Sequence, residues 1–473
     1  MIDLHHLVRW LPEQRWFGGK GRQIAAADLI DEAIVRDGDP TLVIVVVLVH
    51  YQDGDSELYH LPLLTHSDGS FSDAGEEPQS LAVLGDLMAH GTPLKGNSSV
   101  FNFSGPGLDP LSEHVWTSAR LVGAEQSNTS VVMDESIIVK FLRRVQPGTN
   151  PERELTRLLT NQGFPHIPEH IGEITFEGTV DDDEITMDLA VAQRFLAGAV
   201  EGWTSTLQHL HSLYDSIPAD TVSPPQLTAM TEELAGESLA SLQDLGDVTA
   251  GLHVALTKEE LGPESLPSLI DRQDLQRSAG AFRSSVRAVV ATGVGEVQKW
   301  APRLEQRAQR FLRVTRAGFK TRVHGDYHLG QVLTSERGWM IIDFEGEPAR
   351  SLEERRQKQS PLRDVAGMLR SFSYAASVSL SDRASFGSKE WSRLQPWADV
   401  WEDLARGRFL TAYLRRSHEG KFLPPNRPDL KAMLDVFEID KALYEIDYEQ
   451  RNRPDWVQIP LHGLARILGP ATR

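Results

Sequence analysis

Two strand-like runs near the start of the chain, rich in apolar residues, predict a small sheet. The first spans 42–49 (LVIVVVLV) and the second spans 57–64. Short apolar runs bounded by turn residues are typical of buried strands. Asp53-Gly54 lies between them, and this pair favours the positive φ angles that tight hairpin turns require. We therefore expect a first domain, containing a hairpin, over residues 1–95.

The composition of the chain changes after this first domain. Residues 91–110 are rich in Gly, Ser, Asn and Pro, which predicts a linker or an irregular crossing. Apolar residues at 131–133 and 137–142 then predict a hairpin behind a polar loop. A third hairpin is predicted from 171–176 and 184–195, which flank an acidic turn.

A helix is expected between these two hairpins. Asn150 can cap its first turn, and Pro151 suits the first helical position, where no backbone N–H is needed. Loop, hairpin, helix and hairpin, in this order, are typical of the small lobe of a kinase. We expect this lobe over residues 96–196.

Beyond residue 197 the apolar positions follow a helical period, which predicts a mainly helical large lobe over 197–473. One long helical segment is expected at 281–317, broken near Gly293 and Pro302, and another at 397–414. Pro and Gly are the residues that most often end or kink a helix.

One segment that interrupts this helical pattern carries the strongest chemical signal. Residues 324–331 (HGDYHLGQ) form a His-x-Asp-x-x-x-x-Gln loop, and the apolar run 340–342 leads directly into Asp343. Kinase-like folds use this arrangement to place one carboxylate beside the attacking hydroxyl and a second on magnesium. Asp326 is predicted to be the catalytic base, with Gln331 and Asp343 as ligands of Mg²⁺. An Asp that only caps a turn is the plain alternative.

The predicted ATP site depends chiefly on Lys140, which lies within an apolar strand. A solvent-facing Lys on an edge strand is the alternative reading. Glu154, on the expected helix, would pair with it as the strand Lys and helix Glu do in protein kinases. A polar loop at 126–130 stands where kinases carry glycines, and 193–195 stands at the hinge position. The predicted ATP-binding residues are Ser127, Asn128, Thr129, Ser130, Lys140, Glu154, Gln193 and Phe195.

A helical stripe near the end of the chain suggests sugar binding. Lys441, Tyr444, Glu445 and Tyr448 follow the spacing i, i+3, i+4 and i+7, which places them on one helix face. Aromatic faces stack on pyranose rings and charged groups bind hydroxyls, although an ordinary amphipathic surface helix remains an alternative. The predicted substrate-binding residues are His324, Glu345, Lys441, Tyr444, Glu445 and Tyr448. For His324, hydrogen bonding that stiffens the loop is favoured over direct catalysis.

The composition of the chain limits the kinds of molecule that it is expected to bind. A chain of 473 residues exceeds one ordinary core, and a net charge of −19 argues against nucleic acid and anionic membranes. A small neutral or cationic substrate is favoured, and an ATP site would have to be locally basic. The chain contains no cysteine, which excludes disulfides and thiolate chemistry. With neither a signal sequence nor a membrane-length apolar run, we expect a cytoplasmic protein.

Taken together, the motifs resemble those of the bacterial maltokinases, which phosphorylate maltose at its reducing end with ATP. The segments that carry the resemblance are 14–20 (QRWFGGK), 125–130, 143–148, 324–331, 342–348 and 441–445. The resemblance implies an α+β fold, bilobal and protein-kinase-like, with an additional N-terminal α/β cap domain over 1–95. It also implies Gln331 as the family's usual metal residue, ATP and Mg²⁺ as cofactors, and α-maltose 1-phosphate as the product.

The resemblance further implies a place in the route from trehalose through maltose to glycogen-like α-glucan. Trehalose synthase is a partner expected only by analogy with fused relatives. Two alternatives stay open at this point. A kinase of the same fold could act on another sugar or on an amino sugar, and a non-catalytic regulator could be built on the same scaffold.

Overall fold

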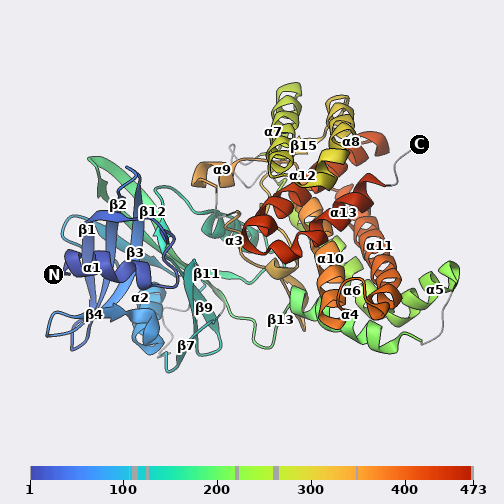
Figure 1. The fold of residues 1–473 in the computed structure, drawn as a ribbon. Coiled ribbons are helices and arrows are strands. Elements are labelled where there is room, and N and C mark those ends of the chain that lie inside the picture. The colour runs from blue at the N-terminus through green and yellow to red at the C-terminus, as the bar shows by residue number, and fades with distance from the viewer. Residues whose placement is uncertain are drawn as a thin grey trace. The chain divides into compact units, whose positions relative to one another are not determined.

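The computed structural model describes residues 2–105, 107–108, 116–123, 127–218, 223–258, 266–347 and 350–469. It forms two compact units, Met1–Gly198 and Ala199–Arg473 (Figure 1). The first unit is built around two antiparallel sheets and the second is mainly helical. The 91–110 segment, predicted as a linker, instead contributes strands β5 (Leu94–Lys95) and β6 (Val100–Ser104). Its Gly, Ser and Asn residues make the turn between these two strands.

The first sheet contains the predicted hairpin, which is confirmed. Strands β1 (Ile24–Arg36), β2 (Thr41–Tyr51) and β3 (Ser56–Thr65) are neighbours in it, and β3 also pairs with β4 (Phe71–Asp73) and β10 (Arg144–Val145). Helix α1 (Leu4–Trp10) begins at Asp3, whose carboxylate accepts from the N–H groups of His5 and His6.

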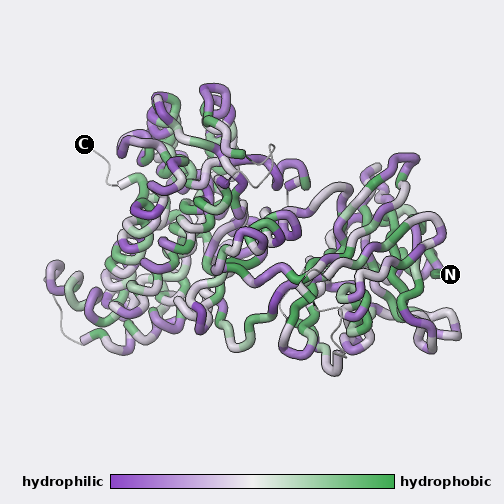
Figure 2. Tube along the Cα trace, turned by 180° about the vertical axis from the view of Figure 1, so that it is seen from behind, coloured by the Kyte–Doolittle hydropathy of each residue, from purple (hydrophilic) through white to green (hydrophobic). Residues whose placement is uncertain are grey.

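The apolar run of β2 is continuous because both of its faces are buried. Leu42, Ile44 and other even-numbered residues belong to one hydrophobic cluster, which also includes side chains of the second sheet. Val43, Val45 and other odd-numbered residues pack in a separate cluster with Leu7 of α1. Figure 2 shows hydrophobic residues concentrated along such strands and hydrophilic residues at the turns.

The second sheet has seven strands in the order β5-β6-β11-β12-β9-β8-β7. Both hairpins predicted in this region are confirmed. The bounds are β7 (Ala119–Leu121), β8 (Asn128–Met133), β9 (Ile137–Leu142), β11 (His170–Val180) and β12 (Asp183–Arg194). Acidic residues with positive φ, 50° at Asp181 and 68° at Asp182, form the turn between β11 and β12. Asp tolerates this conformation better than most residues.

Helices pack beside these strands. Helix α3 (Pro151–Asn161) begins as predicted, with the side chain of Asn150 accepting from the N–H of Glu152. Helix α2 (Val83–His90) ends at Gly91, which has a φ of 61°.

A buried ion pair links the two sheets of the first unit. The guanidinium of Arg143 has no exposed surface, and it donates to the carboxylate of Asp73 at 2.7 Å. The same carboxylate accepts from the indole N–H of Trp16 at 2.7 Å. Arg143 also donates to Oγ1 of Thr129 at 2.9 Å. Three segments that are distant in the sequence are therefore held at one carboxylate.

The second unit consists of helices and two small sheets. Its helices are α4 (Gly202–Ser216), α5 (Pro224–Leu234), α6 (Gly236–Ala255), α7 (Arg272–Ala291), α8 (Gly295–Leu312), α9 (Leu352–Arg356), α10 (Leu362–Arg383), α11 (Lys389–Ser417), α12 (Arg427–Asn452) and α13 (Gln458–Leu468). The small sheets are β13 (Val200–Glu201), β16 (Val332–Ser335) and β17 (Gly338–Ile341), and β14 (Ser268–Leu269) with β15 (Phe319–Lys320). In the described part of the chain, no helix is long and apolar enough to cross a membrane.

The expected break at Gly293 is confirmed, because α7 ends before it and α8 begins after it. The expected break at Pro302 is wrong, since α8 continues through this residue. Val297 and Leu304 are both buried on either side of Pro302, so tertiary packing holds the helix together despite the lost hydrogen bond. Helix α11 likewise extends beyond the predicted 397–414 and contains Pro396.

The buried ion pair leads to a stability prediction. Replacing Asp73→Ala would leave the Arg143 guanidinium buried without its carboxylate partner, which typically costs about 3–5 kcal/mol. We expect a loss of this size in the free energy of unfolding of the first unit, measured by denaturant titration. Glu135→Gln is the matched control, because the Arg120–Glu135 pair is about half exposed on both sides (51% and 54%) and exposed ion pairs contribute little to stability. Equal effects of the two changes would contradict the argument.

Candidate active site

The predicted magnesium ligands meet at the base of one hairpin. Gln331 precedes β16 directly and Asp343 follows the end of β17, and these two strands pair with Val332 opposite Ile341. The amide nitrogen of Gln331 consequently donates to Oδ2 of Asp343 at 2.9 Å. The hairpin thus brings an amide and a carboxylate, both oxygen-bearing groups of the kind that Mg²⁺ prefers, into contact.

Asp343 has an unusual backbone conformation. Its φ is +63°, in the left-handed region that residues with a side chain seldom occupy. Conformations of this kind cost of order 1–3 kcal/mol and are found most often at functional sites. The turn that follows contains Phe344, which is fully buried and packs against the ring of His324 at a centroid distance of 4.9 Å.

The predicted base, Asp326, lies between two nitrogen-bearing side chains. Nζ of Lys441 lies 3.3 Å from its Oδ1, and Nε2 of His328 lies 3.9 Å from its Oδ2. Burial acts to lower the pKa of Lys441, but the carboxylates of Asp326, Glu445 and Glu347 outweigh it, so the pKa is raised and Lys441 is a cation. Burial lowers the pKa of His328, so its imidazole is neutral near pH 7.

A buried carboxylate on α10 holds the loop that carries Asp326. Oδ2 of Asp364 accepts from the main-chain N–H of His324 at 2.8 Å, and Oδ1 accepts from that of Gly325 at 3.0 Å. Nε2 of His253 lies 3.0 Å from Oδ2. Burial alone would raise the pKa of Asp364, but these partners lower it, so the carboxylate stays ionised.

A glycine allows this close approach of α10 to the loop. A Cβ added at Gly367 would lie only 2.5 Å from the main-chain oxygen of Tyr327. Any larger residue would therefore push α10 and the loop apart. The hydroxyl of Tyr327, in turn, lies 2.9 Å from that of Thr249 on α6. Helices α6 and α10 thus both hold the loop in place.

His324 supports the site from within the loop. Its Nε2 donates to the main-chain oxygen of Ile342 at 2.9 Å, and its Nδ1 accepts from the N–H of Asp326 at 3.4 Å. The residue is 1% exposed. Both ring nitrogens therefore face the main chain, which corrects the substrate-binding role expected for His324. The geometry agrees with the loop-stiffening role that was favoured for it.

Asp326 borders a small cavity of about 190 Å³ within the second unit. Lys441 and Tyr444 of the predicted sugar-binding stripe line it. Other polar side chains that line it were not foreseen from the sequence: Ser285, Glu347, Arg350, Gln359, Arg363, Asp364 and Asp440. Ligand pockets usually measure ~300–1,000 Å³, so this cavity has the size of an enclosure for one end of a substrate.

Three of the carboxylates that line this cavity have a cation beside them, and the fourth, Asp364, binds the main-chain N–H groups described above. Glu347 accepts from Nε of Arg350 at 2.8 Å, and Arg363 lies 3.7 Å from the carboxylate of Asp440. Lys441 pairs with Asp326, as described above. Each of these carboxylates thus has a cation beside it. A neutral ligand with hydroxyl groups is favoured, because it can bind such pairs without leaving a charge unpaired.

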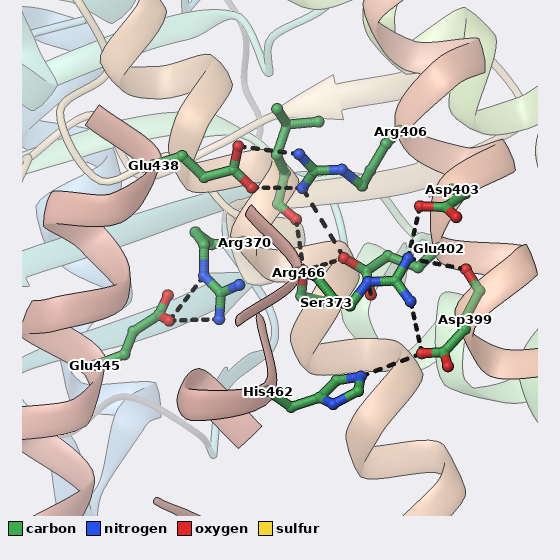
Figure 3. Close-up of polar contacts among 11 residues, drawn as sticks. Arg370, Ser373, Asp399, Glu402, Asp403, Arg406, Glu438, Glu445, His462 and Arg466 are labelled. Atoms are coloured by element: carbon green, nitrogen blue, oxygen red, sulfur yellow. Dashed lines mark hydrogen bonds and ion pairs between the residues drawn. The ribbon is translucent and has the colours of Figure 1, made fainter. Parts of the chain in front are cut away.

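The predicted stripe on α12 divides into two parts. Tyr444 and Tyr448 are 47% and 44% exposed and their rings stack at 6.4 Å, with Nζ of Lys441 5.1 Å from the ring of Tyr444. Glu445 instead pairs with Arg370, whose Nε donates to it at 2.9 Å (Figure 3). The guanidinium of Arg370 is 1% exposed, so Glu445 has a structural partner.

Glu345 also lies outside the cavity lining. Nη1 of Arg355 donates to the main-chain oxygen of Glu345 at 3.1 Å and lies 4.0 Å from its carboxylate. Arg355 lies on α9, so this short helix steadies the turn after Asp343. Glu347, two residues further along, is the acidic residue of this turn that lines the cavity.

The predicted ATP-binding residues lie in the first unit. Lys140 of β9 is paired with Ser130 of β8 and with Val191 of β12. Gln193 is two residues from Val191, so Ser130, Lys140 and Gln193 project from the same face of the sheet. The N–H of Phe195 donates to the main-chain oxygen of Ser136 at 2.9 Å. Glu154 lies on α3, and Ser127 is exposed just before β8.

Two residues of the predicted phosphate loop have other partners. Thr129 points to the opposite face from Lys140, where its hydroxyl accepts from the buried Arg143. Asn128 accepts from the main-chain N–H of Arg143 at 3.3 Å. The side-chain contact with phosphate expected for Thr129 is therefore corrected, because strand alternation turns this hydroxyl away from Lys140. Gln126 of the same motif lies outside the described residues.

Within the described residues, no three His, Cys, Asp or Glu side chains gather to form a metal site of their own. This agrees with the chemistry of Mg²⁺, which is usually bound by one or two carboxylates together with substrate phosphates and water. Gln331 and Asp343 fit such a site. A bound Mg²⁺ would neutralise charge on transferring phosphate oxygens.

A loop with a carboxylate beside a small polar cavity, next to a hairpin base with an amide and a second carboxylate, defines a phosphotransferase centre of the kinase type. Comparison with known families supports the same class of enzyme. Residues 118–397 match the phosphotransferase enzyme family, and residues 10–90 match the maltokinase N-terminal cap domain. The chain belongs to the phosphotransferase enzyme family and carries the cap domain of the maltokinases.

Individual relatives are similar over most of the chain. It is 25% identical to a glucosamine kinase of Mycolicibacterium smegmatis over 87% of this chain and 94% of that one. It is also 25% identical to a glucosamine kinase of Streptacidiphilus jiangxiensis, over 74% of each. A solved glucosamine kinase in complex with glucosamine, ADP and inorganic phosphate has a TM-score of 0.68 at 20% identity and covers 94% of both chains. The expected kinase-like fold with an N-terminal cap domain is thus confirmed.

The position of Asp364 yields a prediction about the loop. In Asp364→Asn, an amide group replaces one of two oxygens that accept N–H groups, so a donor would face a donor. We expect the loop with Asp326 to shift and kcat to fall by ~10²-fold, because small misplacements of a catalytic group have effects of this size. KM for the acceptor should change little. Asp382→Asn, at the exposed end of the same helix, is the matched control and should leave kcat unchanged. A folded Asp364→Asn protein with normal kcat would contradict this role.

Proposed function

We propose that this protein transfers the γ-phosphoryl group of ATP to the anomeric hydroxyl of maltose. The observation that carries the proposal is the carboxylate of Asp326, which borders a polar cavity with paired charges and lies beside the cation Lys441. In the reaction the sugar hydroxyl forms a bond to phosphorus and the bond from phosphorus to ADP breaks. The hydroxyl proton passes to Asp326, so the sugar 1-phosphate and ADP are the products.

The other site residues act by binding and orientation. Lys441 would bind hydroxyl oxygens of the sugar, and Tyr444 with Tyr448 would offer ring faces for stacking. Gln331 and Asp343 would hold Mg²⁺. In the first unit, Ser130 and Lys140 would bind phosphate oxygens, Glu154 would pair with Lys140, and main-chain groups around Gln193 and Phe195 would bind adenine.

Two observations support maltose as the acceptor. The cap-domain match and the motif at 441–445 both resemble maltokinases. In the cavity beside Asp326, the carboxylates of Asp326, Glu347 and Asp440 each have a cation beside them, which suits a neutral sugar. With about 190 Å³, it would enclose the reacting ring, and the second ring would lie over Tyr444 and Tyr448.

Glucosamine is the second candidate, and its support comes from the relatives, which are named glucosamine kinases. Glucosamine carries an ammonium group, which would require a carboxylate without a cationic partner, or the displacement of Lys441 or of an Arg from its own partner. Docking onto trehalose synthase and a role in glycogen synthesis stay expectations of the maltokinase resemblance.

The first experiment identifies the acceptor. The purified protein with ATP and Mg²⁺ is offered maltose, glucose, trehalose, glucosamine and an aminoglycoside separately, and the product is read by NMR. We expect a phosphate on the anomeric oxygen of maltose. Transfer to glucosamine instead would move the second candidate to first place. ATP binding without transfer to any acceptor would favour a regulator built on a kinase scaffold.

A second experiment tests the base. Asp326→Asn keeps the size and shape of the side chain but cannot accept a proton, so kcat should fall by ~10²–10⁴-fold. Binding of ATP, measured by calorimetry, should persist. The conservative change Glu135→Gln, on the exposed turn after β8, serves as a control. If a folded Asp326→Asn protein keeps near-full activity, Asp326 is not the base.

A further inference from the structure

The second unit contains a larger cavity that shares no lining residue with the one beside Asp326. Its volume is about 960 Å³, roughly five times the 190 Å³ of the first. Parts of α8, α10, α11, α13 and the segment after α12 enclose it. Cavities of ~300–1,000 Å³ are the usual size of small-molecule sites, and nothing in the phosphoryl transfer described above uses this one.

Four aromatic side chains from four different elements line this cavity. Trp300 comes from α8, Phe386 from the turn between α10 and α11, Trp391 from the first turn of α11, and Trp456 from the short helix η6 (Pro454–Trp456). Phe386 is 76% exposed, although its ring meets that of Trp391 edge-on at 5.2 Å. Large aromatic side chains gathered at an open cavity are a frequent mark of ligand binding.

The polar lining is rich in acceptors and poor in cations. The cavity is lined by the carboxylates of Glu296, Asp382, Asp399, Glu402 and Asp455, by the hydroxyls of Ser377, Ser381, Ser385 and Ser392, and by the imidazole of His462. An anion such as a nucleotide or a sugar phosphate would be repelled by such a lining. The ligand should therefore carry hydroxyl donors and no negative charge.

Two of the carboxylates that line the cavity, those of Asp399 and Glu402, have an arginine beside them (Figure 3). Arg466 lies 2.7 Å from Asp399 and 3.5 Å from Glu402, and Nε2 of His462 lies 3.2 Å from Asp399. Glu402 also accepts from the hydroxyl of Ser373 at 2.5 Å. These two carboxylates have a cationic partner within the protein and do not require one from the ligand.

We propose that this cavity is a second carbohydrate site, which binds neutral oligosaccharides by stacking their rings on Phe386, Trp391 and Trp456. The hydroxyl groups of the rings donate to the carboxylate and serine oxygens. Because the cavity is several times larger than the one beside Asp326, it takes more than one sugar ring. Its ligand needs no free anomeric hydroxyl, so binding here is independent of the proposed transfer reaction.

The test uses a sugar that cannot be phosphorylated at the anomeric position. Methyl α-maltotrioside, a neutral trisaccharide whose anomeric oxygen carries a methyl group, is titrated into the protein without ATP by calorimetry. We expect saturable binding that becomes at least about tenfold weaker in Phe386→Ala and in Ser381→Trp, which would fill the cavity. Both changed residues are exposed, so the fold and the rate of phosphoryl transfer should remain unaffected.

Other outcomes overturn the proposal. Binding that survives both changes but is lost in Tyr444→Ala would place the trisaccharide on α12, at the proposed acceptor site. Absence of binding to the wild-type protein, or a preference for glucosamine or spermidine over the trisaccharide, would exclude a neutral-sugar site. Since the readout is binding without ATP, failure here leaves the proposed kinase activity untouched, and an inactive kinase can still bind the trisaccharide.

Discussion

The buried carboxylate of Asp364 is the interaction on which the candidate active site depends. In the loop that carries Asp326, the consecutive main-chain N–H groups of His324 and Gly325 both donate to this carboxylate. A buried ion is costly unless several donors bind it, and here His253 supplies a third. The first turn of α10 thereby fixes the position of the loop. Gly367 allows the helix to approach the main chain of Tyr327 closely.

Much of the candidate site is local in the sequence, which explains why it could be predicted. Gln331 and Asp343 flank one hairpin, so their encounter follows from strand pairing alone. Lys441 and Tyr444 share a helix face by periodicity. The support of Asp326 was not predictable in the same way, because Asp364 and His253 approach it from helices that are distant in the sequence. Their polar side chains carry no local signal that distinguishes them from other helix residues.

The predictions for Pro302 and Thr129 failed for physical reasons. Pro302 was expected to break a helix on propensity, yet buried residues on both sides of it hold α8 together. Thr129 was expected to contact phosphate because it belongs to the polar stretch at 126–130, which was predicted to be a loop. Once Thr129 is part of a strand, alternation decides its direction, and its hydroxyl meets Arg143 instead. Tertiary packing in one case and strand geometry in the other outweighed composition.

The buried cluster around Arg143 connects the cap domain to the second sheet of the first unit. Trp16 lies in the motif at 14–20 and Arg143 in that at 143–148, and both donate to Asp73 of the cap sheet. Arg143 also holds Thr129 on β8, the neighbour of the strand with Lys140. A substitution in the cap domain that displaces Arg143 would therefore also affect Thr129 and β8. The link requires that one buried carboxylate accept from both an indole and a guanidinium, which constrains both sheets at once.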